Sequence, residues 1–370
     1  MGEDRCVFAT LTLARRYASK MSNTLQTGLV QLGRWLRGEI PGKGADDADL
    51  LRRAEEQNRW FIPSFTRDAM HACGEMLQIR VMEQWMRPYK VTANTNPKRV
   101  GLILAGNIPM VGFHDIVCVL LAGHLPVVKC STSDGLLIPA ALSFLAETND
   151  EGEARFEFSA GQLGQVDAVI ATGSSNSNRY FEAYFNHLPR ILRSQRTSVA
   201  VLNGSESSEA IRDLGKDVFQ YYGMGCRSVT KLFLPRGFDL NRLFREWLEW
   251  DFLANNNKYA NNYDYHKAIW LLNGEELLEN GFLLLKEDSS LFSPVGTLFY
   301  EFYDDIHRVR ERLDSDGHLI QCISSMQAGG METGSWPTYA FGSNQCPLPW
   351  DYADGIDTME FLLALSSSTH

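Results

Sequence analysis

The chain has 370 residues, of which 44% are hydrophobic and 22% charged, and its formal net charge at pH 7 is −10. This composition is typical of a globular protein, and the length allows two or more domains or one large α/β unit. The acidic balance argues against nucleic acid and against an anionic membrane surface as the main partner, because both attract clustered cations.

Residues 1–20 precede the first clear structural pattern. Acidic residues stand where a secretory signal has its basic region, and the apolar run is short, so no signal peptide is predicted. Met21 opens a second plausible start, and we interpret residues 1–20 as a loose leader or as an extension from a wrongly chosen start. No apolar stretch has the length of a transmembrane helix, so we predict no membrane span.

Helical patterns come next, and strands follow them. Residues 22–90 are predicted to be helical because apolar residues recur at helical spacing. Apolar runs at 100–106, 125–131, 166–173 and 198–204 are then typical of strands buried on both faces, and helical segments separate them. This alternation indicates a parallel, doubly wound sheet, as in a nucleotide-binding α/β domain.

The alternation restarts after Gly204. The expected elements are helices at 205–223, 238–253 and 306–315 and strands at 228–235, 267–273, 282–288, 294–303 and 319–325. A glycine-rich stretch at 328–337 is expected to be a mobile loop. We predict an α/β fold of two doubly wound domains with a helical N-terminal region: residues 21–205 for nucleotide binding, 206–345 for catalysis, and 346–370 as a returning C-terminal segment.

Seven cysteines occur at irregular spacing, without a C-x-x-C pair or a zinc-type cluster, so no metal site is predicted. Free thiols in a reducing, cytoplasmic compartment are expected. One cysteine has an unusual setting: in YYGMGCRSVT, Cys226 follows Gly225 and precedes Arg227, whose charge favours the thiolate. Buried structural cysteines prefer apolar neighbours, as Cys118 has in IVCVLL. This setting favours a nucleophile, with a structural thiol as the alternative.

Small or polar residues follow each strand of the first predicted sheet, at the edge where open α/β sheets bind ligands. No G-x-G-x-x-G fingerprint occurs, so an ordinary dinucleotide site is not supported. In ATGSSNSNRYF, Gly173 permits a tight turn before a helix whose N-terminus could receive a phosphate, although a plain turn and cap is the commoner use of such a motif. Lys129 could reach a cofactor or extend to solvent, and Asn107 could donate to an oxyanion or cap a helix.

These pieces occur in the order seen in the acyl-CoA reductases of the LuxC type, the fatty-aldehyde-forming branch of the aldehyde dehydrogenase superfamily. The chain resembles that family from about Met21 to Ser366. The resemblance is closest in LAGNIPMVGFHD, VIATGSSNSNRYF, GMGCRSVTKLF, NNNKYANNYDYHKAIWLL, NGFLLLKEDSSLFSPV and WDYADGIDTMEFLL. It implies an aldehyde dehydrogenase-like fold.

The resemblance also implies residue roles. Cys226 matches the catalytic cysteine, and Asn107, in AGNIP, matches an asparagine that helps to form the oxyanion hole. Lys129 matches the lysine at the adenosine ribose, and Gly173 with Ser174 match a pair at the cofactor's phosphates. The cofactor contacts that we expect are Ala105, Gly106, Lys129, Ser131, Thr172, Gly173, Ser174, Leu202 and Phe292. His114, in GFHD, is the candidate proton donor, with a partly buried structural histidine as the alternative.

Two departures from the superfamily pattern are informative. Val201, in VLNG, is interpreted as standing where hydrolytic aldehyde dehydrogenases carry a general-base glutamate, and the loss of a carboxylate there would favour reduction of an acyl group over oxidation to a free acid. Ser290 stands where the superfamily has a ribose-binding glutamate, which leaves the details of cofactor binding open.

The predicted function is the reduction of a fatty acyl-CoA to the aldehyde through an acyl-cysteine. NADPH is the expected cofactor, with NADH as the alternative, and both rest on the resemblance. Relatives work with an acyl-protein synthetase and an acyltransferase, so such a partner is expected, as is a homo-oligomer. The alternatives are a reductase of an acyl phosphate or a protein-bound acyl group, and a catalytically silent, complex-forming subunit.

Overall fold

The computed structural model describes residues 23–42, 47–91, 94, 96–148, 155–173, 175–326 and 336–367. The predicted leader at 1–20 and most of the predicted loop at 328–337 lie outside these residues. The chain forms two compact units. The first comprises residues 1–194 and 348–370, and the second comprises residues 195–347.

The first unit begins with the expected helical region. Its helices are α2 (Asn23–Leu36), α3 (Asp47–Gln57), α4 (Pro63–Met76) and α5 (Ile79–Met86), and α2 packs against both α4 and the later helix α7 (Leu137–Thr148). The apolar spacing that predicted these helices becomes their buried face: Leu29, Leu32 and Leu36 are all buried.

A five-stranded parallel sheet forms the centre of the first unit. Its order is β3 (Glu157–Phe158), β2 (Leu125–Lys129), β1 (Arg99–Ile103), β4 (Ala168–Thr172) and β5 (Arg190–Arg193). Helices α6 (Phe113–Leu121) and α8 (Ser175–Tyr184) connect these strands. The short strands at the two edges, β3 and β5, were not predicted from the sequence.

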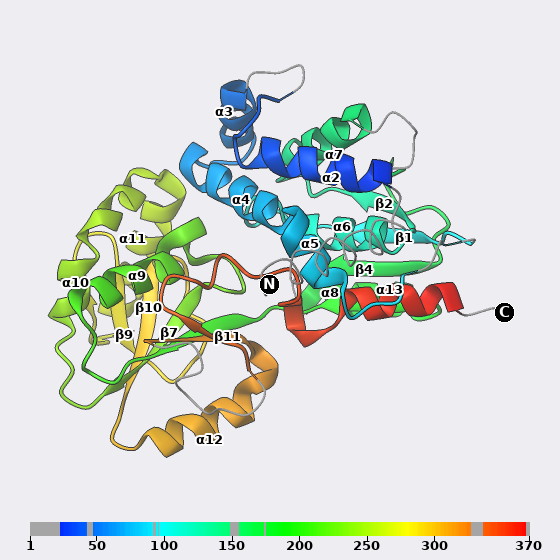
Figure 1. Ribbon diagram of the computed structural model, residues 1–370. Coiled ribbons are helices and arrows are strands. Elements are labelled where there is room, and N and C mark those ends of the chain that lie inside the picture. Colours follow the sequence, from blue (N-terminus) through cyan, green and yellow to red (C-terminus); the bar gives the residue numbers. More distant parts are fainter. Residues whose placement is uncertain are drawn as a thin grey trace, which may run out of the picture. The chain divides into compact units, whose positions relative to one another are not determined.

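The C-terminal helix α13 (Thr358–Ser367) returns to the first unit, where Figure 1 shows it in red beside the sheet. The His124 Nε2 donates a hydrogen bond to the Leu362 carbonyl at 2.9 Å, and α13 packs against α6. The Arg193 guanidinium, buried at the end of β5, bonds both carboxylate oxygens of Asp115 and the Thr358 hydroxyl. This buried cluster joins the sheet, α6 and the C-terminal segment.

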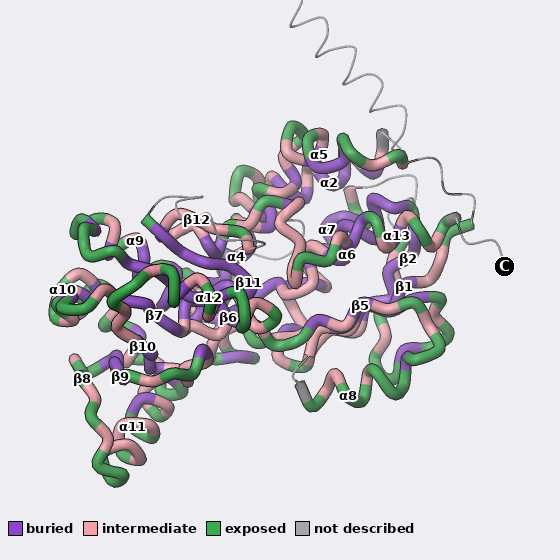
Figure 2. Tube along the Cα trace, turned by 90° about the horizontal axis from the view of Figure 1, so that it is seen from below, coloured by how far each residue is buried: buried purple, intermediate pink, exposed green. Residues whose placement is uncertain are grey.

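The second unit contains a seven-stranded sheet. Its order is β12 (Thr338–Ala340), β11 (Ile320–Ser325), β6 (Thr197–Val201), β7 (Val229–Pro235), β10 (Thr297–Tyr303), β9 (Leu284–Glu287) and β8 (Leu278–Glu279). All neighbouring strands are parallel except β8 and β9. The α-helices are α9 (Ser208–Phe219), α10 (Asn241–Glu246), α11 (Asn257–Leu272) and α12 (Ile306–Asp316). Figure 2 shows that buried residues concentrate on the central strands β6, β7 and β11.

Three secondary-structure predictions for this part of the chain were wrong. The strand expected at 198–204 does not join the first sheet; it is β6 of the second. The strand expected at 267–273 is the last part of α11, which begins where the Asn256 side chain accepts the amide hydrogens of Lys258 and Tyr259. The helix expected at 238–253 is divided into α10 and a 3₁₀ segment at Leu248–Asn255.

None of the helices in the described ranges combines the length and the apolar run that a membrane crossing requires.

Candidate active site

Cys226 lies in a turn at the amino edge of the second sheet. Helix α9 ends at Phe219, and Tyr221 and Tyr222 then adopt left-handed backbone conformations with φ of 55° and 58°. Such conformations cost about 1–3 kcal/mol each in residues other than glycine. Both tyrosines are buried, and the Tyr222 hydroxyl accepts a hydrogen bond from the Asn256 amide at 2.9 Å. Packing therefore imposes a sharp change of chain direction four residues before Cys226.

The turn itself is closed by its own backbone. The Ser228 N–H donates to the Gly225 carbonyl at 3.0 Å, and the Gly225 N–H donates to the Ser228 hydroxyl at 3.2 Å. The Cys226 carbonyl accepts a hydrogen bond from the Ser198 hydroxyl at 3.0 Å, which ties the turn to β6. Cys226 is nevertheless exposed.

Arg227 differs from its neighbour in burial. Its guanidinium lies over the Tyr339 ring, 5.3 Å from the ring centroid, and the residue is buried. A buried cation is screened less by solvent than an exposed one, so its field acts more strongly on nearby groups. The sequence had indicated only that a cation adjoins Cys226.

The cysteine thiols differ in their exposure to solvent, and burial changes their pKa. Burial raises the pKa of Cys73 and Cys322 to about 12, and burial with the nearby Asp134 carboxylate raises the pKa of Cys130 to about 11. These thiols are protonated near neutral pH and are poor nucleophiles. Within the described residues, the exposed cysteines are Cys226 and Cys346.

Phe292 lies at the same edge of the second sheet as Cys226. The Thr230 hydroxyl, near the start of β7, donates to the Leu291 carbonyl at 2.6 Å, and Phe292 packs against the cluster of buried residues that includes Val199. The structure therefore brings Phe292 and Cys226 to one edge of the second sheet, and the role of Phe292 at a nicotinamide ribose stays a prediction.

Leu202 and Val201 lie at the opposite edge. Val201 ends β6 and packs in the apolar core, and the Leu202 carbonyl accepts a hydrogen bond from the Tyr303 hydroxyl at the end of β10. Ser198, which contacts Cys226, is three residues from Val201 and four from Leu202 along the strand, or about 10 Å and 13 Å. A glutamate at 201 could not serve Cys226. The identity of Val201 therefore carries no information about the direction of the reaction, and Leu202 is not brought to Cys226.

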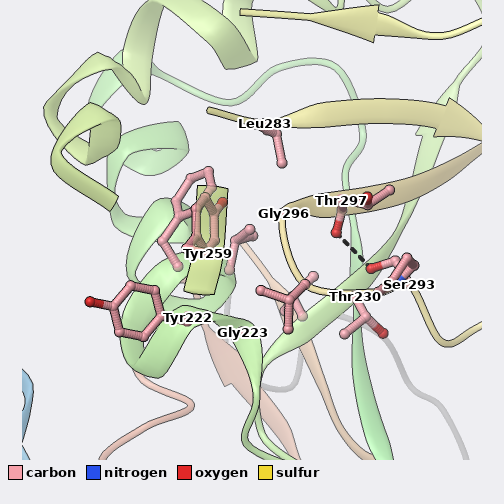
Figure 3. Close-up of a pocket in the computed structure, with 13 residues that line it drawn as sticks. Tyr222, Gly223, Thr230, Tyr259, Leu283, Ser293, Gly296 and Thr297 are labelled. Atoms are coloured by element: carbon pink, nitrogen blue, oxygen red, sulfur yellow. Dashed lines mark hydrogen bonds between the residues drawn. The ribbon is translucent and has the colours of Figure 1, made fainter. Parts of the chain in front are cut away.

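A small cavity is lined in part by residues that precede and follow the Cys226 turn (Figure 3). Its wall includes Tyr222, Gly223, Thr230, Tyr259 and Thr297. The free volume of about 20 Å³ holds roughly one water molecule, so the cavity cannot accept an acyl chain. The Thr297 hydroxyl is buried without a hydrogen-bond partner among the described residues, and a water in this cavity would satisfy it.

The remaining predicted cofactor residues gather at the carboxyl edge of the first sheet. The chain leaves β1 toward β2 on one side, and it leaves the neighbouring β4 toward β5 on the other. Ligands of open α/β sheets bind at such a reversal of strand order. The residues that end or follow the three strands here are Ala105, Gly106, Asn107, Lys129, Ser131, Thr172 and Gly173; Ser174 lies outside the described residues.

Two glycines at this edge allow close approach. A Cβ atom on Gly106 would lie 2.6 Å from the Ser131 hydroxyl, and one on Gly173 would lie 2.9 Å from the Ser177 and Phe181 side chains. The backbone can therefore pass close to neighbouring groups at the ends of β1 and β4. Asn107 is exposed between them.

Asp134 fixes the loops of this edge. It is buried, and its carboxylate accepts the amide hydrogens of Met110, at 3.0 Å, and Leu137, at 3.3 Å. Burial raises its pKa to about 6, although the two amide hydrogen bonds oppose that shift. With both oxygens occupied by backbone groups, Asp134 has a structural role and is not a ribose ligand.

We expect the Asp134 carboxyl to make stability depend on pH. Because its pKa is raised from 3.8 in the unfolded chain to about 6, the folded state binds more protons in this range, and the free energy of unfolding should fall as pH rises from about 4 to 6. The fall should be roughly 2–3 kcal/mol. Urea unfolding across this range should show a flatter profile for Asp134→Asn, and an unchanged slope would contradict the assignment.

His114 has packing contacts in the first unit. Its ring stacks on Trp85, with centroids 5.0 Å apart, contacts the edge of Tyr352, and its Nε2 lies 2.8 Å from the Pro349 carbonyl. This is the arrangement of a structural histidine, and we do not give His114 a role in proton transfer. Within the described residues, no group of three His, Cys, Asp or Glu side chains could hold a metal ion.

Four residues around the turn had no signal in the sequence. Ser198, Asp217, Asn344 and Gln345 are polar residues in separate segments, and only the tertiary structure places them near Cys226. Cys226 belongs to the second unit, whereas Asn107 and the edge with Lys129 belong to the first.

The chain was compared with known proteins. No protein-family model and no curated protein sequence matches it. Solved structures do match: aldehyde dehydrogenase 21 from Physcomitrella patens, in complex with the reaction product succinate, has a TM-score of 0.64 at 13% identity over 98% of this chain and 87% of that one. An aldehyde dehydrogenase from Brucella melitensis biovar abortus 2308 has a TM-score of 0.61 at 14% identity, over 87% and 76%.

The chain has the aldehyde dehydrogenase fold. A third structure with this fold, a variant of aldehyde dehydrogenase C from Pseudomonas syringae in complex with NAD⁺ and octanal, has a TM-score of 0.57 at 15% identity, over 84% of this chain and 75% of that one. The aldehyde dehydrogenase fold accounts for the parallel five-stranded sheet and the largely parallel seven-stranded sheet, and confirms the fold class predicted from the sequence.

Proposed function

We propose that the protein reduces a fatty acyl thioester to the aldehyde, through an acyl group held on Cys226. The observation that carries the proposal is the exposed thiol in a closed, glycine-flanked turn of a protein with the aldehyde dehydrogenase fold. Neighbours of the same fold were solved with NAD⁺, and one of them with octanal, an aliphatic aldehyde. These complexes support a nicotinamide cofactor and an aliphatic product.

The first half of the reaction needs only groups of this chain and the substrate. The Cys226 sulfur attacks the thioester carbon, the carbonyl oxygen becomes an oxyanion, and the bond to the CoA sulfur breaks with its electron pair on CoA. The oxyanion needs hydrogen-bond donors, and we assign the Cys226 backbone amide and, from the sequence resemblance, the Asn107 side chain. Removing one such donor costs about 10²–10³ in rate, and Asn107→Ala in an acylation assay tests this assignment.

The carboxyl edge of the first sheet would hold the cofactor. Gly106 and Gly173 leave room for close approach, and Lys129 and Ser131 offer donors to ribose or phosphate oxygens. A reduced nicotinamide bound there would supply the hydride that the acyl carbon needs. NADPH is our first choice and NADH the alternative.

We expect Gly106→Val to weaken nucleotide binding by at least tenfold, because the Cβ of valine would clash with Ser131 and alter the edge. Gly161→Ala is the matched control, since a Cβ at Gly161 meets no atom within 4 Å. Fluorescence titration with NADPH and with NADH measures both variants. Equal affinity for wild type and Gly106→Val would place the cofactor elsewhere.

Intact mass spectrometry tests the proposed function. Mixing the protein with myristoyl-CoA, without cofactor, should add one acyl group, and NADPH should then discharge it as the aldehyde. An adduct that water discharges rapidly to the free acid would instead favour an enzyme that oxidises aldehydes. An absence of adduct at every chain length would favour an acyl phosphate or protein-bound donor, or a silent subunit.

The location, the oligomeric state and the partner of the protein are also part of the proposal. We propose a cytoplasmic location, a homo-oligomer, and a partner of the acyl-protein synthetase or acyltransferase type that delivers the acyl group. Light scattering tests the oligomer, and transfer from an acylated partner to Cys226 tests the delivery.

A further inference from the structure

The segment Phe341–Cys346 contacts the Cys226 turn from outside the sequence motif. The Asn344 side-chain amide donates to the Arg227 carbonyl at 3.1 Å, and the Gln345 side-chain amide donates to the Ser228 hydroxyl at 3.3 Å. Asn344 is completely buried, and Gln345 is buried too. The two side-chain amides therefore bond to the two residues that follow Cys226, at the Arg227 carbonyl and the Ser228 hydroxyl.

The same segment is fixed at its other side by a buried carboxylate. Asp217, on α9, accepts the Gly342 N–H at 2.8 Å, the Asn344 N–H at 3.0 Å and the Ser324 hydroxyl at 3.2 Å. Asp217 is fully buried. A carboxylate that accepts several hydrogen bonds in a low-dielectric interior holds its donors firmly, because an unpaired buried charge would be costly.

The contacts form one chain of support. The Asp217 carboxylate accepts a hydrogen bond from the Asn344 backbone amide, and the Asn344 side-chain amide donates one to the Arg227 carbonyl. On the other side, Gln345 contacts the Ser228 hydroxyl, which accepts the Gly225 N–H. The residues immediately before and after Cys226 are thus both held, and so is the Cys226 carbonyl, by Ser198.

We propose that Asn344 is a positioning residue for acyl transfer at Cys226, and that Asp217 holds it in place. The proposal rests on the proposed function for its natural substrate, because it concerns the same thiol. Asn344 does not touch the reacting atoms. It fixes the peptide between Arg227 and Ser228, two peptide planes after the one that carries the Cys226 backbone amide, and through this short turn it supports the direction of that amide, the donor for the oxyanion.

A misplacement of about 1 Å in such a donor can reduce a rate about 100-fold. Asn344→Ala should therefore slow acyl transfer by about 10–100-fold. Alkylation by iodoacetamide is a displacement at carbon that forms no oxyanion, so it should change by less than about threefold. This difference separates the position of the donor from the reactivity of the thiol.

The acyl donor for this test is p-nitrophenyl acetate. The Cys226 sulfur takes the acetyl group, p-nitrophenolate leaves with the bonding electron pair, and the thiol proton goes to solvent. The burst of p-nitrophenolate measures acylation without CoA or cofactor, and peptide mass spectrometry locates both labels at Cys226. If wild type gives this burst but no adduct with any acyl-CoA, the proposed function fails while the role of Asn344 is still tested.

Ser343→Ala is the matched control, because it lies in the same turn and its side chain makes no described contact with Cys226. It should acylate at the wild-type rate. Gln345→Ala and Asp217→Asn provide further variants if Asn344→Ala does not fold, and both should slow acylation more than alkylation. Asn344→Gln, which keeps the amide donor, should recover part of the rate.

Acylation of Asn344→Ala within twofold of wild type would overturn the proposal. An equal loss of acylation and alkylation would also overturn it, because the thiol itself would then have changed. A loss of the same size in Ser343→Ala would show a general effect on folding rather than positioning.

Discussion

Replacing Cys226 by alanine should abolish acyl transfer to the protein. The expected loss of turnover is about 10⁴-fold or more, because a covalent pathway without its nucleophile retains only binding and electrostatic stabilisation. The geometry gives this prediction its specificity: Cys226 is exposed, whereas burial keeps Cys73 and Cys322 protonated near neutral pH. Intact mass spectrometry and steady-state turnover with NADPH measure the two effects.

Cys346→Ala is the matched control, since Cys346 is the second exposed thiol in the described part of the second unit. It should keep both the acyl adduct and turnover within about twofold of wild type. An acyl group that stays on Cys226→Ala would assign the nucleophile to another residue. Loss of turnover in both variants would indicate damage to the fold around the turn.

Replacing Arg193 by methionine should lower the free energy of unfolding by about 3–5 kcal/mol, which is the usual cost of removing one partner of a buried ion pair. The Arg193 guanidinium donates to both oxygens of Asp115, at 2.5 and 3.3 Å, to the Thr358 hydroxyl at 2.9 Å and to the Ala353 carbonyl at 2.8 Å. The side chains of the pair are only 6% and 8% exposed. Without the cation, the Asp115 charge would stay in the interior of the first unit.

An exposed pair with similar geometry provides the control. Arg236 donates to both oxygens of Asp304, at 2.6 and 2.8 Å, but these side chains are 67% and 68% exposed. Arg236→Met should therefore lower the free energy of unfolding far less than Arg193→Met does. Urea unfolding of both variants makes the comparison, and the double variant Arg193→Met with Asp115→Leu should recover part of the loss. Equal costs at the two sites would contradict the role of burial.

The sequence was most informative where a continuous apolar run corresponds to a buried strand. The apolar runs that became β1, β2 and β4 predicted strands in a parallel sheet, because their residues are buried on both faces. It was least informative at short edge strands and at apolar runs of ambiguous period. The run KAIWLLN resembles a strand, but the Asn256 cap starts a helix ten residues earlier and the helix continues through it.

In the candidate site, too, residues without a local sequence pattern could not be predicted. Cys226 could be proposed from the sequence because glycines and a cation adjoin it in the chain. Asp217, Asn344 and Gln345 were not, because a single buried polar residue has no local pattern, and its partners lie more than 100 residues away. Val201 was misread for a related reason: a short motif such as VLNG has no strand position until the sheet is known, and β6 places it far from Cys226.

The two units also differ in when their residues become available during synthesis. The second unit is one continuous segment, residues 195–347, whereas the first needs residues on both sides of it. The Arg193 cluster and His124 require Thr358 and Leu362, which leave the ribosome after the whole second unit. Domains normally complete folding from the N-terminus onward during translation. In this chain we expect the reverse order, because the second unit has all its partners first and the first unit needs the last helix.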